Sequence, residues 1–134
     1  MQNRESSEMN GSRYLLDTNA IIALLQGNQQ VSEHLQNAEW IGISLISQLE
    51  FLAFTGLTDG DRQLFEQFLQ QVEVIGLMSD QNELIAQIIQ VRQQYRLLLP
   101  DAIIVATAIQ MNANLITADQ KLHEIQAVTN INFT

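Results

Sequence analysis

Residues 14–22 read YLLDTNAII, and this stretch decides the fold class. A short apolar run ends at Asp17, and Thr18 or Asn19 can cap a helix that carries the apolar residues that follow. A strand that passes directly into a helix is the repeating unit of a parallel α/β sheet. We therefore expect an α/β domain in which Asp17 stands at the carboxyl end of the first strand.

Three further stretches place an acidic residue in a similar position. They are IGISLISQLEFLAF (41–54), LLLPDAIIVATA (97–108) and ANLITADQKL (113–122), with Glu50, Asp101 and Asp119. In an open parallel sheet the carboxyl ends of strands and the amino ends of helices gather along one edge. Asp17, Asp101 and Asp119 fit that edge, and Glu50, about two turns into its helix, would reach the same cleft from the side.

The rest of the chain alternates short apolar runs with helical patterns. We expect strands at 14–16, 40–43, 74–77, 115–116 and 128–133, and helices at about 18–26, 29–37, 44–54, 64–72, 80–96, 100–112 and 120–126. The helix before residue 96 starts at Ser79 or Asp80, and TGLTDGD (55–61) is the clearest loop. This order predicts a mainly parallel sheet of four to five strands, covered by helices on both faces.

The length and composition of the chain indicate one domain. Residues 1–12 read as a polar, disordered tail and residues 13–134 as a single domain. The chain has no cysteine, so any metal must be held by oxygen or imidazole. We expect His34 and His123 to be helix-surface residues and assign neither a role. With no apolar leader and no run of about 18 apolar residues, a soluble, cytoplasmic protein is expected.

Each acidic residue also has a purely structural explanation. Asp17 and Asp119 could cap helices, and Asp101 could complement a helix dipole. Ser47 and Glu50 match a capping box, although the apolar run before them places the helix start at Ser44 and weakens that explanation. Four such coincidences at once favour a functional site, and capping and metal binding can coexist.

A cleft with four carboxylates suits one kind of chemistry. Carboxylate oxygens are ligands for hard cations such as Mg²⁺ and Mn²⁺. Without cations the carboxylates would repel one another, and at least one pKa should rise. These features favour a metal-dependent nuclease, in which one or two metal ions activate the water that attacks a phosphodiester.

The net charge of −9 argues against a nucleic-acid enzyme, because phosphate binding usually leaves a basic footprint. The four proposed ligands supply part of this charge, and bound cations would reverse the local sign. The positive groups are Arg4, Arg13, Arg62, Arg92, Arg96 and Lys121. We therefore expect substrate affinity to be modest, local and salt-sensitive, or to depend on a groove formed by a dimer.

The four stretches, in this order and with this spacing, resemble the blocks of a PIN domain, and the length resembles the VapC-like toxin ribonucleases of toxin–antitoxin pairs. The resemblance runs from about Tyr14 to the last strand near Phe133. It implies a PIN-like three-layer fold and a Mg²⁺- or Mn²⁺-dependent endoribonuclease. It also implies a homodimer and a small antitoxin whose C-terminal segment covers the cleft, often with a basic side chain on the carboxylates.

The resemblance implies roles for individual residues. The acidic site is Asp17, Glu50, Asp101 and Asp119, with Asn19, Ser44 and Thr117 as polar supports. The first three acids rank ahead of Asp119, because the fourth acidic position is the most variable in the family. Many relatives carry a lysine or arginine shortly before the LPDA segment. Here the nearest base is Arg96, so we expect little substrate contact from that side.

Two other interpretations compete with the ribonuclease. A haloacid-dehalogenase-like phosphatase also begins with an aspartate at a strand end, but it needs a second acid two residues later, and position 19 is Asn. A PIN-like protein that mainly binds a partner, with a weak or unused nuclease site, is the stronger alternative. The acidic surface would attract a basic partner, and LEFLAF and the Leu64 to Val72 stripe could form either core or a partner groove.

Overall fold

The computed structural model describes residues 12–125 and 130–133. Within them the strands are β1 (Arg13–Leu16), β2 (Trp40–Ser44), β3 (Glu73–Ile75), β4 (Asn114–Ile116) and β5 (Asn130–Ile131). The helices are α2 (Thr18–Leu25), α3 (Gln29–Leu35), α4 (Leu45–Leu52), α5 (Asp59–Leu69), α6 (Asn82–Tyr95), α7 (Leu99–Gln110) and α8 (Gln120–His123). No helix in the described residues is long and apolar enough to cross a membrane.

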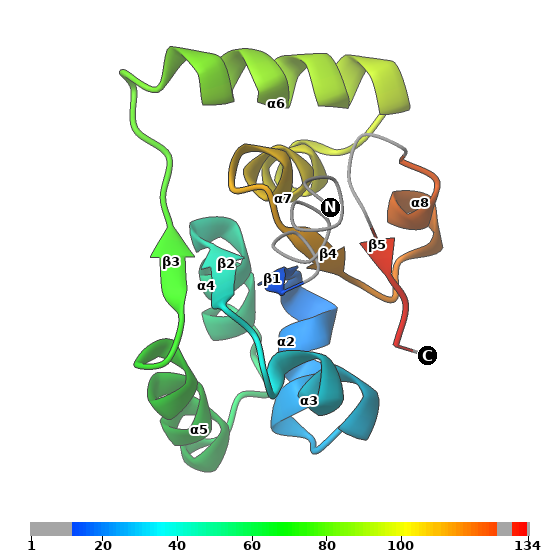
Figure 1. The fold of residues 1–134 in the computed structure, drawn as a ribbon. Helices are drawn as coiled ribbons and strands as arrows, with labels where there is room; N and C mark the ends of the chain where they lie inside the picture. Colours follow the sequence, from blue (N-terminus) through cyan, green and yellow to red (C-terminus); the bar gives the residue numbers. More distant parts are fainter. Residues whose placement is uncertain (1–11, 126–129, 134) are drawn as a thin grey trace, which may run out of the picture.

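The five strands form one sheet in the order β3-β2-β1-β4-β5, and every pair is parallel (Figure 1). Leu16 of β1 pairs with Ile43 of β2 on one side and with Ile116 of β4 on the other. The chain thus extends the sheet from β1 in one direction and later in the other. Such a point, where the strand order reverses, is where open α/β sheets form their clefts.

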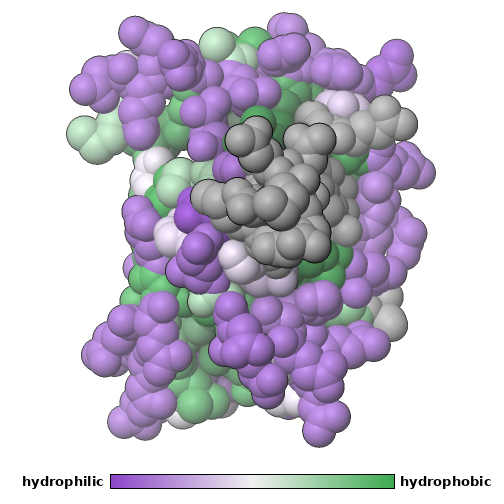
Figure 2. Space-filling model, in the orientation of Figure 1, coloured by the Kyte–Doolittle hydropathy of each residue, from purple (hydrophilic) through white to green (hydrophobic). Residues whose placement is uncertain are grey.

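Helices cover both faces of the sheet, as the sequence predicted. Figure 1 shows α6 and α7 on one side and α2, α3 and α5 on the other. Successive strand residues serve opposite faces: Leu15 and Leu115 pack with α6 and α7, whereas Leu16 and Ile116 pack with α2, α3 and α5. Hydrophilic side chains gather over α6 and over the opposite end of the molecule (Figure 2). The result is the three-layer α/β architecture expected for this chain.

Helix α7 is the central helix of the fold. Its residues from Ala102 to Ala108 are all buried. Asp101, in the first turn of the helix, is half-buried. Pro100 lies in that first turn, where its missing N–H costs no helical hydrogen bond. The preceding helix α6 stops at Arg96, which adopts a left-handed conformation with φ 55°. This tight connection fixes Asp101 at the edge of the sheet.

Several expected boundaries were wrong. The TGLTDGD segment is only partly a loop, because Thr58 and Asp61 form a reciprocal capping box and α5 begins at Asp59. The long helix begins at Asn82 and not at Ser79 or Asp80. The cap of α2 is Asp17 and not Thr18 or Asn19.

Two expectations fall wholly or partly outside the described residues. The predicted tail covers 1–12, of which 1–11 are not described. The last helix was expected over 120–126 and the last strand over 128–133, and residues 126–129 are not described. Within the described part, α8 ends at His123 and β5 spans Asn130–Ile131.

Candidate active site

The four predicted acidic residues line a single pocket at the carboxyl edge of the sheet. Its volume is about 300 Å³, and it is lined by Asp17, Thr18, Asn19, Ile22, Glu50, Asp101, Ile104 and Asp119. These residues come from α2, α4, α7 and the segment after β4. The fold therefore brings together four carboxylates that are as many as 102 positions apart in the sequence, from Asp17 to Asp119.

Asp17 is the buried member of the group, with 5% of its surface exposed. Its Oδ1 accepts a hydrogen bond of 3.2 Å from the backbone N–H of Ala20, which caps α2, and its Oδ2 accepts one from the Thr117 hydroxyl. Burial raises the pKa of Asp17 to about 6, helped by the charges of Asp119 and Asp101 and opposed by these two hydrogen bonds.

Asp101 is half-buried on the wall formed by α7. Burial is the main cause that raises its pKa, and the negative charges of Asp119 and Glu50 raise it further. Lys121 acts in the opposite direction and lowers it. The Lys121 ammonium group donates a hydrogen bond of 3.2 Å to the backbone carbonyl of Arg96, so it stands at the rim next to the start of α7.

Glu50 reaches the pocket from α4. Ser44, not Ser47, caps this helix, since the Ser44 hydroxyl accepts a hydrogen bond of 3.1 Å from the backbone N–H of Ile46. The capping-box explanation of Glu50 is therefore wrong. The Glu50 carboxylate instead accepts a hydrogen bond of 2.6 Å from the Thr18 hydroxyl of α2.

Asp119 closes the pocket from the segment after β4. Its side chain caps α8 by accepting a hydrogen bond of 2.9 Å from the backbone N–H of Lys121. Thr117 turns this segment, because its hydroxyl oxygen accepts a hydrogen bond of 3.0 Å from the Asp119 N–H. The structural explanation of Asp119 is therefore correct as far as it goes, and it does not keep the residue out of the pocket.

The donor set of this pocket fits a hard divalent cation. Its charged groups are all carboxylates, and burial and mutual repulsion raise the pKa of Asp17 and Asp101, a cost that a bound cation would relieve. In residues 12–125 and 130–133, however, no three acidic, histidine or cysteine side chains stand as a ready-made metal cage. A cation held here would keep part of its water shell, as Mg²⁺ usually does.

Comparison with protein families shows the family of this chain. Residues 14–128 match the family model described as the PIN domain. The chain belongs to the PIN domain family. PIN domains are generally nucleases, so this membership places the chain in a family of nucleic-acid hydrolases.

Several solved structures have a similar fold. A toxin–antitoxin complex from Klebsiella pneumoniae is 30% identical, with a TM-score of 0.71 over 87% of this chain and 95% of that one. VapBC2 from Rickettsia felis, bound to a promoter DNA fragment, is 19% identical with a TM-score of 0.75 over 90% and 98%. FitAcB from Neisseria gonorrhoeae is 23% identical with a TM-score of 0.64 over 89% and 96%. No curated protein matches the sequence.

The three polar residues expected to support the site, Asn19, Ser44 and Thr117, lie at different places relative to the pocket. Asn19 lines the pocket, and its Oδ1 accepts a hydrogen bond of 3.1 Å from the backbone N–H of Ala118, which ties α2 to the segment after β4. Thr117 contacts Asp17 directly. Ser44 is buried and its hydroxyl caps α4, so it orients the helix that carries Glu50 and does not line the pocket.

Two contacts around the PIN pocket escaped the sequence analysis. The Thr18 hydroxyl bonds Glu50, and His123 lies with its Nε2 2.7 Å from the backbone carbonyl of Thr117. The first contact joins residues 32 positions apart, whereas the second spans the short segment between β4 and α8. His34 does not line the pocket and lies beside Tyr14, with 5.9 Å between ring centroids.

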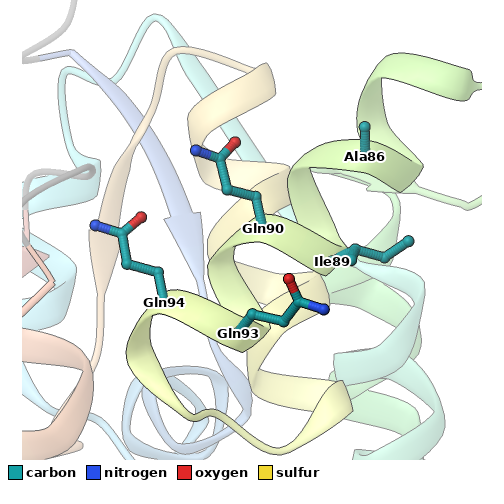
Figure 3. A pocket seen from close by; sticks show the side chains of 5 residues that line it. All are labelled: Ala86, Ile89, Gln90, Gln93 and Gln94. Carbon is teal, nitrogen blue, oxygen red and sulfur yellow. The ribbon is translucent and has the colours of Figure 1, made fainter.

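A larger hollow of this PIN domain is lined by apolar and amide side chains. It measures about 590 Å³ and lies on the outer side of α6, where Figure 3 shows its five lining residues, Ala86, Ile89, Gln90, Gln93 and Gln94. None of these side chains is ionisable. The larger hollow therefore lacks groups for acid–base chemistry or metal binding, whereas the smaller pocket is lined by the four carboxylates.

Proposed function

We propose that this PIN domain is a Mg²⁺- or Mn²⁺-dependent endoribonuclease and the toxin of a toxin–antitoxin pair. The observation that carries the proposal is the single pocket lined by Asp17, Glu50, Asp101 and Asp119. Family membership supports nuclease activity in general. The choice of RNA rests on the resemblance to VapC-like ribonucleases, and the toxin role is supported by the solved toxin–antitoxin complexes with this fold.

The proposed ligands are Asp17, Glu50 and Asp101, with Asp119 as the weaker fourth. When bound, a divalent cation would neutralise the cleft, lower the pKa of a water and polarise the phosphodiester. The chain itself supplies orientation. Thr117 holds Oδ2 of Asp17, the Ala20 N–H holds Oδ1, and the cap of α8 fixes Asp119. Because Asp17 has a pKa of about 6, it is mostly ionised and ready to bind a cation at neutral pH.

Cleavage of labelled structured RNA, including transfer RNA, tests this proposal. Purified protein is incubated with Mn²⁺, with EDTA, and as the Asp17→Asn variant, which controls for contaminating ribonuclease. We expect cleavage only by the wild-type protein with Mn²⁺. Undiminished cleavage by Asp17→Asn would refute the site assignment, and cleavage in EDTA would refute the metal requirement.

A groove next to the carboxylates favours the second candidate function, partner binding. It measures about 310 Å³ and is lined by Ile22, Leu25, Gln26, Glu50, Phe51, Phe54, Leu57 and Asp61. Phe54 is 64% exposed, and the groove shares Ile22 and Glu50 with the carboxylate pocket. An antitoxin segment with an apolar anchor and a basic residue would fit both features.

The same cleavage assay separates the two candidates. Intact RNA in every lane, from a folded wild-type protein with Mn²⁺, would favour a PIN domain whose main role is to bind a partner.

Most of the Leu64 to Val72 stripe belongs to the core. Phe65 and Phe68 are buried, and Phe65 stacks on Phe51 with 4.2 Å between the ring centroids. The groove is lined mainly by α2, α4 and the segment after α4, and α5 contributes Asp61. We also propose a cytoplasmic homodimer, as the resemblance implies.

A further inference from the structure

Thr18 makes a contact that its local structure does not require. It is the first residue of α2, a helix that the Asp17 side chain caps by accepting a hydrogen bond from the backbone N–H of Ala20. Its hydroxyl instead donates a hydrogen bond of 2.6 Å to Oε1 of Glu50, 32 residues away on α4. Thr18 thus joins the helix that follows Asp17 to the helix that carries Glu50.

Glu50 needs such a partner more than Asp17 and Asp119 do. Asp17 and Asp119 are each fixed by capping their own helix. Glu50 is exposed, extends from the last turn of α4 and repels Asp101, whose pKa it raises. A free glutamate side chain under this repulsion would turn toward solvent, and ordering it costs rotamer entropy. In the described residues Thr18 is its only hydrogen-bond donor.

We propose that Thr18 is a positioning residue that holds the Glu50 carboxylate at the pocket for cation binding. The inference rests on the proposed metal-dependent function. Thr18 acts through Glu50, because its one hydroxyl proton is donated to Oε1 of that residue. The other carboxylate oxygen, Oε2, accepts no hydrogen bond from the described residues and is available to a cation. The β-branched threonine has restricted rotamers, which keeps the hydroxyl aimed across the gap between α2 and α4.

Binding of Mn²⁺ without RNA tests the inference, with free Mn²⁺ followed by electron paramagnetic resonance. Thr18→Val removes the hydroxyl and keeps the shape, Thr18→Ser keeps the hydroxyl, and Thr55→Val, at an exposed loop threonine, is the matched control. We expect Thr18→Val to weaken Mn²⁺ binding about tenfold, within the range for partners of metal ligands. Thr18→Ser should stay within about threefold of wild type and Thr55→Val should equal it.

A double-variant cycle separates positioning from a general structural role. If Thr18 acts through Glu50, Thr18→Val should add no further loss of Mn²⁺ affinity to Glu50→Gln, because interacting residues are not additive. Additive losses would overturn the inference, as would wild-type affinity in Thr18→Val. Thermal melting in EDTA checks that the variants fold.

Cleavage measured in parallel keeps the inference distinct from the proposed function. At saturating Mn²⁺ the Thr18→Val protein should recover most of the wild-type kcat, since excess cation compensates for weaker binding. Wild-type protein that binds Mn²⁺ but does not cut RNA would refute the ribonuclease and leave the Thr18 result to stand on binding. Wild-type protein that binds no Mn²⁺ would overturn both.

Discussion

Asp17 shows how one residue serves both fold and site. It caps α2, accepts a hydrogen bond from the Thr117 hydroxyl and lines the pocket, so capping a helix and lining the pocket coexist in this aspartate. Its position at a strand end was predictable from YLLDTNAII alone. The Thr18 contact with Glu50 was not, because it depends on the packing of α2 against α4 and leaves no local pattern.

The raised pKa of Asp17 predicts a stabilising substitution in metal-free protein. Below the unfolded value of 3.8 the carboxyl is neutral in both states, and as the pH rises to about 6 the unfolded state ionises first, so stability is lost. A shift from 3.8 to about 6 corresponds to about 3 kcal/mol at most. In EDTA at pH 7.5, Asp17→Asn should therefore unfold at higher denaturant concentration than wild type.

This advantage of Asp17→Asn should shrink as the pH falls from 6 to below 4, with Asp80→Asn, an exposed residue outside the carboxylate pocket, as the control. Chemical unfolding across this pH range measures the difference directly. Parallel stability curves for wild type and Asp17→Asn would show that burial does not penalise this carboxylate.

At the level of elements, the sequence predicted the strands and most helices because their apolar periods match the two faces of the sheet. It failed where capping outweighed composition. The Thr58 to Asp61 segment contains Gly60 and two aspartates, which favour a loop, but the reciprocal capping box makes it the first turn of α5. The carboxyl-edge convergence of the acids was predictable from the alternation of strands and helices, and the start of α4 at Ser44 was predicted from the apolar run before it.

The capping box of α5 can be tested by Thr58→Ala. The substitution removes the acceptor for the Asp61 N–H, at 3.1 Å, and should cost about 1 kcal/mol. For a domain of this size we expect the melting temperature to fall by about 3–4 °C, measured by calorimetry. Thr55→Ala, in the loop before it, should change little. An unchanged melting temperature in Thr58→Ala would mean that α5 is held by Phe65 and Phe68 alone.

The whole molecule carries a net charge of −9 and yet is proposed to act on a polyanion. Its six basic residues are spread over the chain, and Lys121 is the one whose charge acts on Asp101 at the pocket rim. Divalent cations would therefore have to supply much of the positive charge that meets a substrate phosphate. The central claim is that the carboxyl edge of this PIN domain is a divalent-cation site.

Anomalous diffraction from crystals soaked in Mn²⁺ tests that claim most directly. We expect a peak in the pocket between Asp17, Glu50 and Asp101, about 2 Å from carboxylate oxygens that bind it directly, with waters completing the shell. The Asp17→Asn crystal, soaked in the same way, should lose most of this peak. Density for Mn²⁺ elsewhere on the protein, with none among these carboxylates in well-ordered wild-type crystals, would contradict the claim.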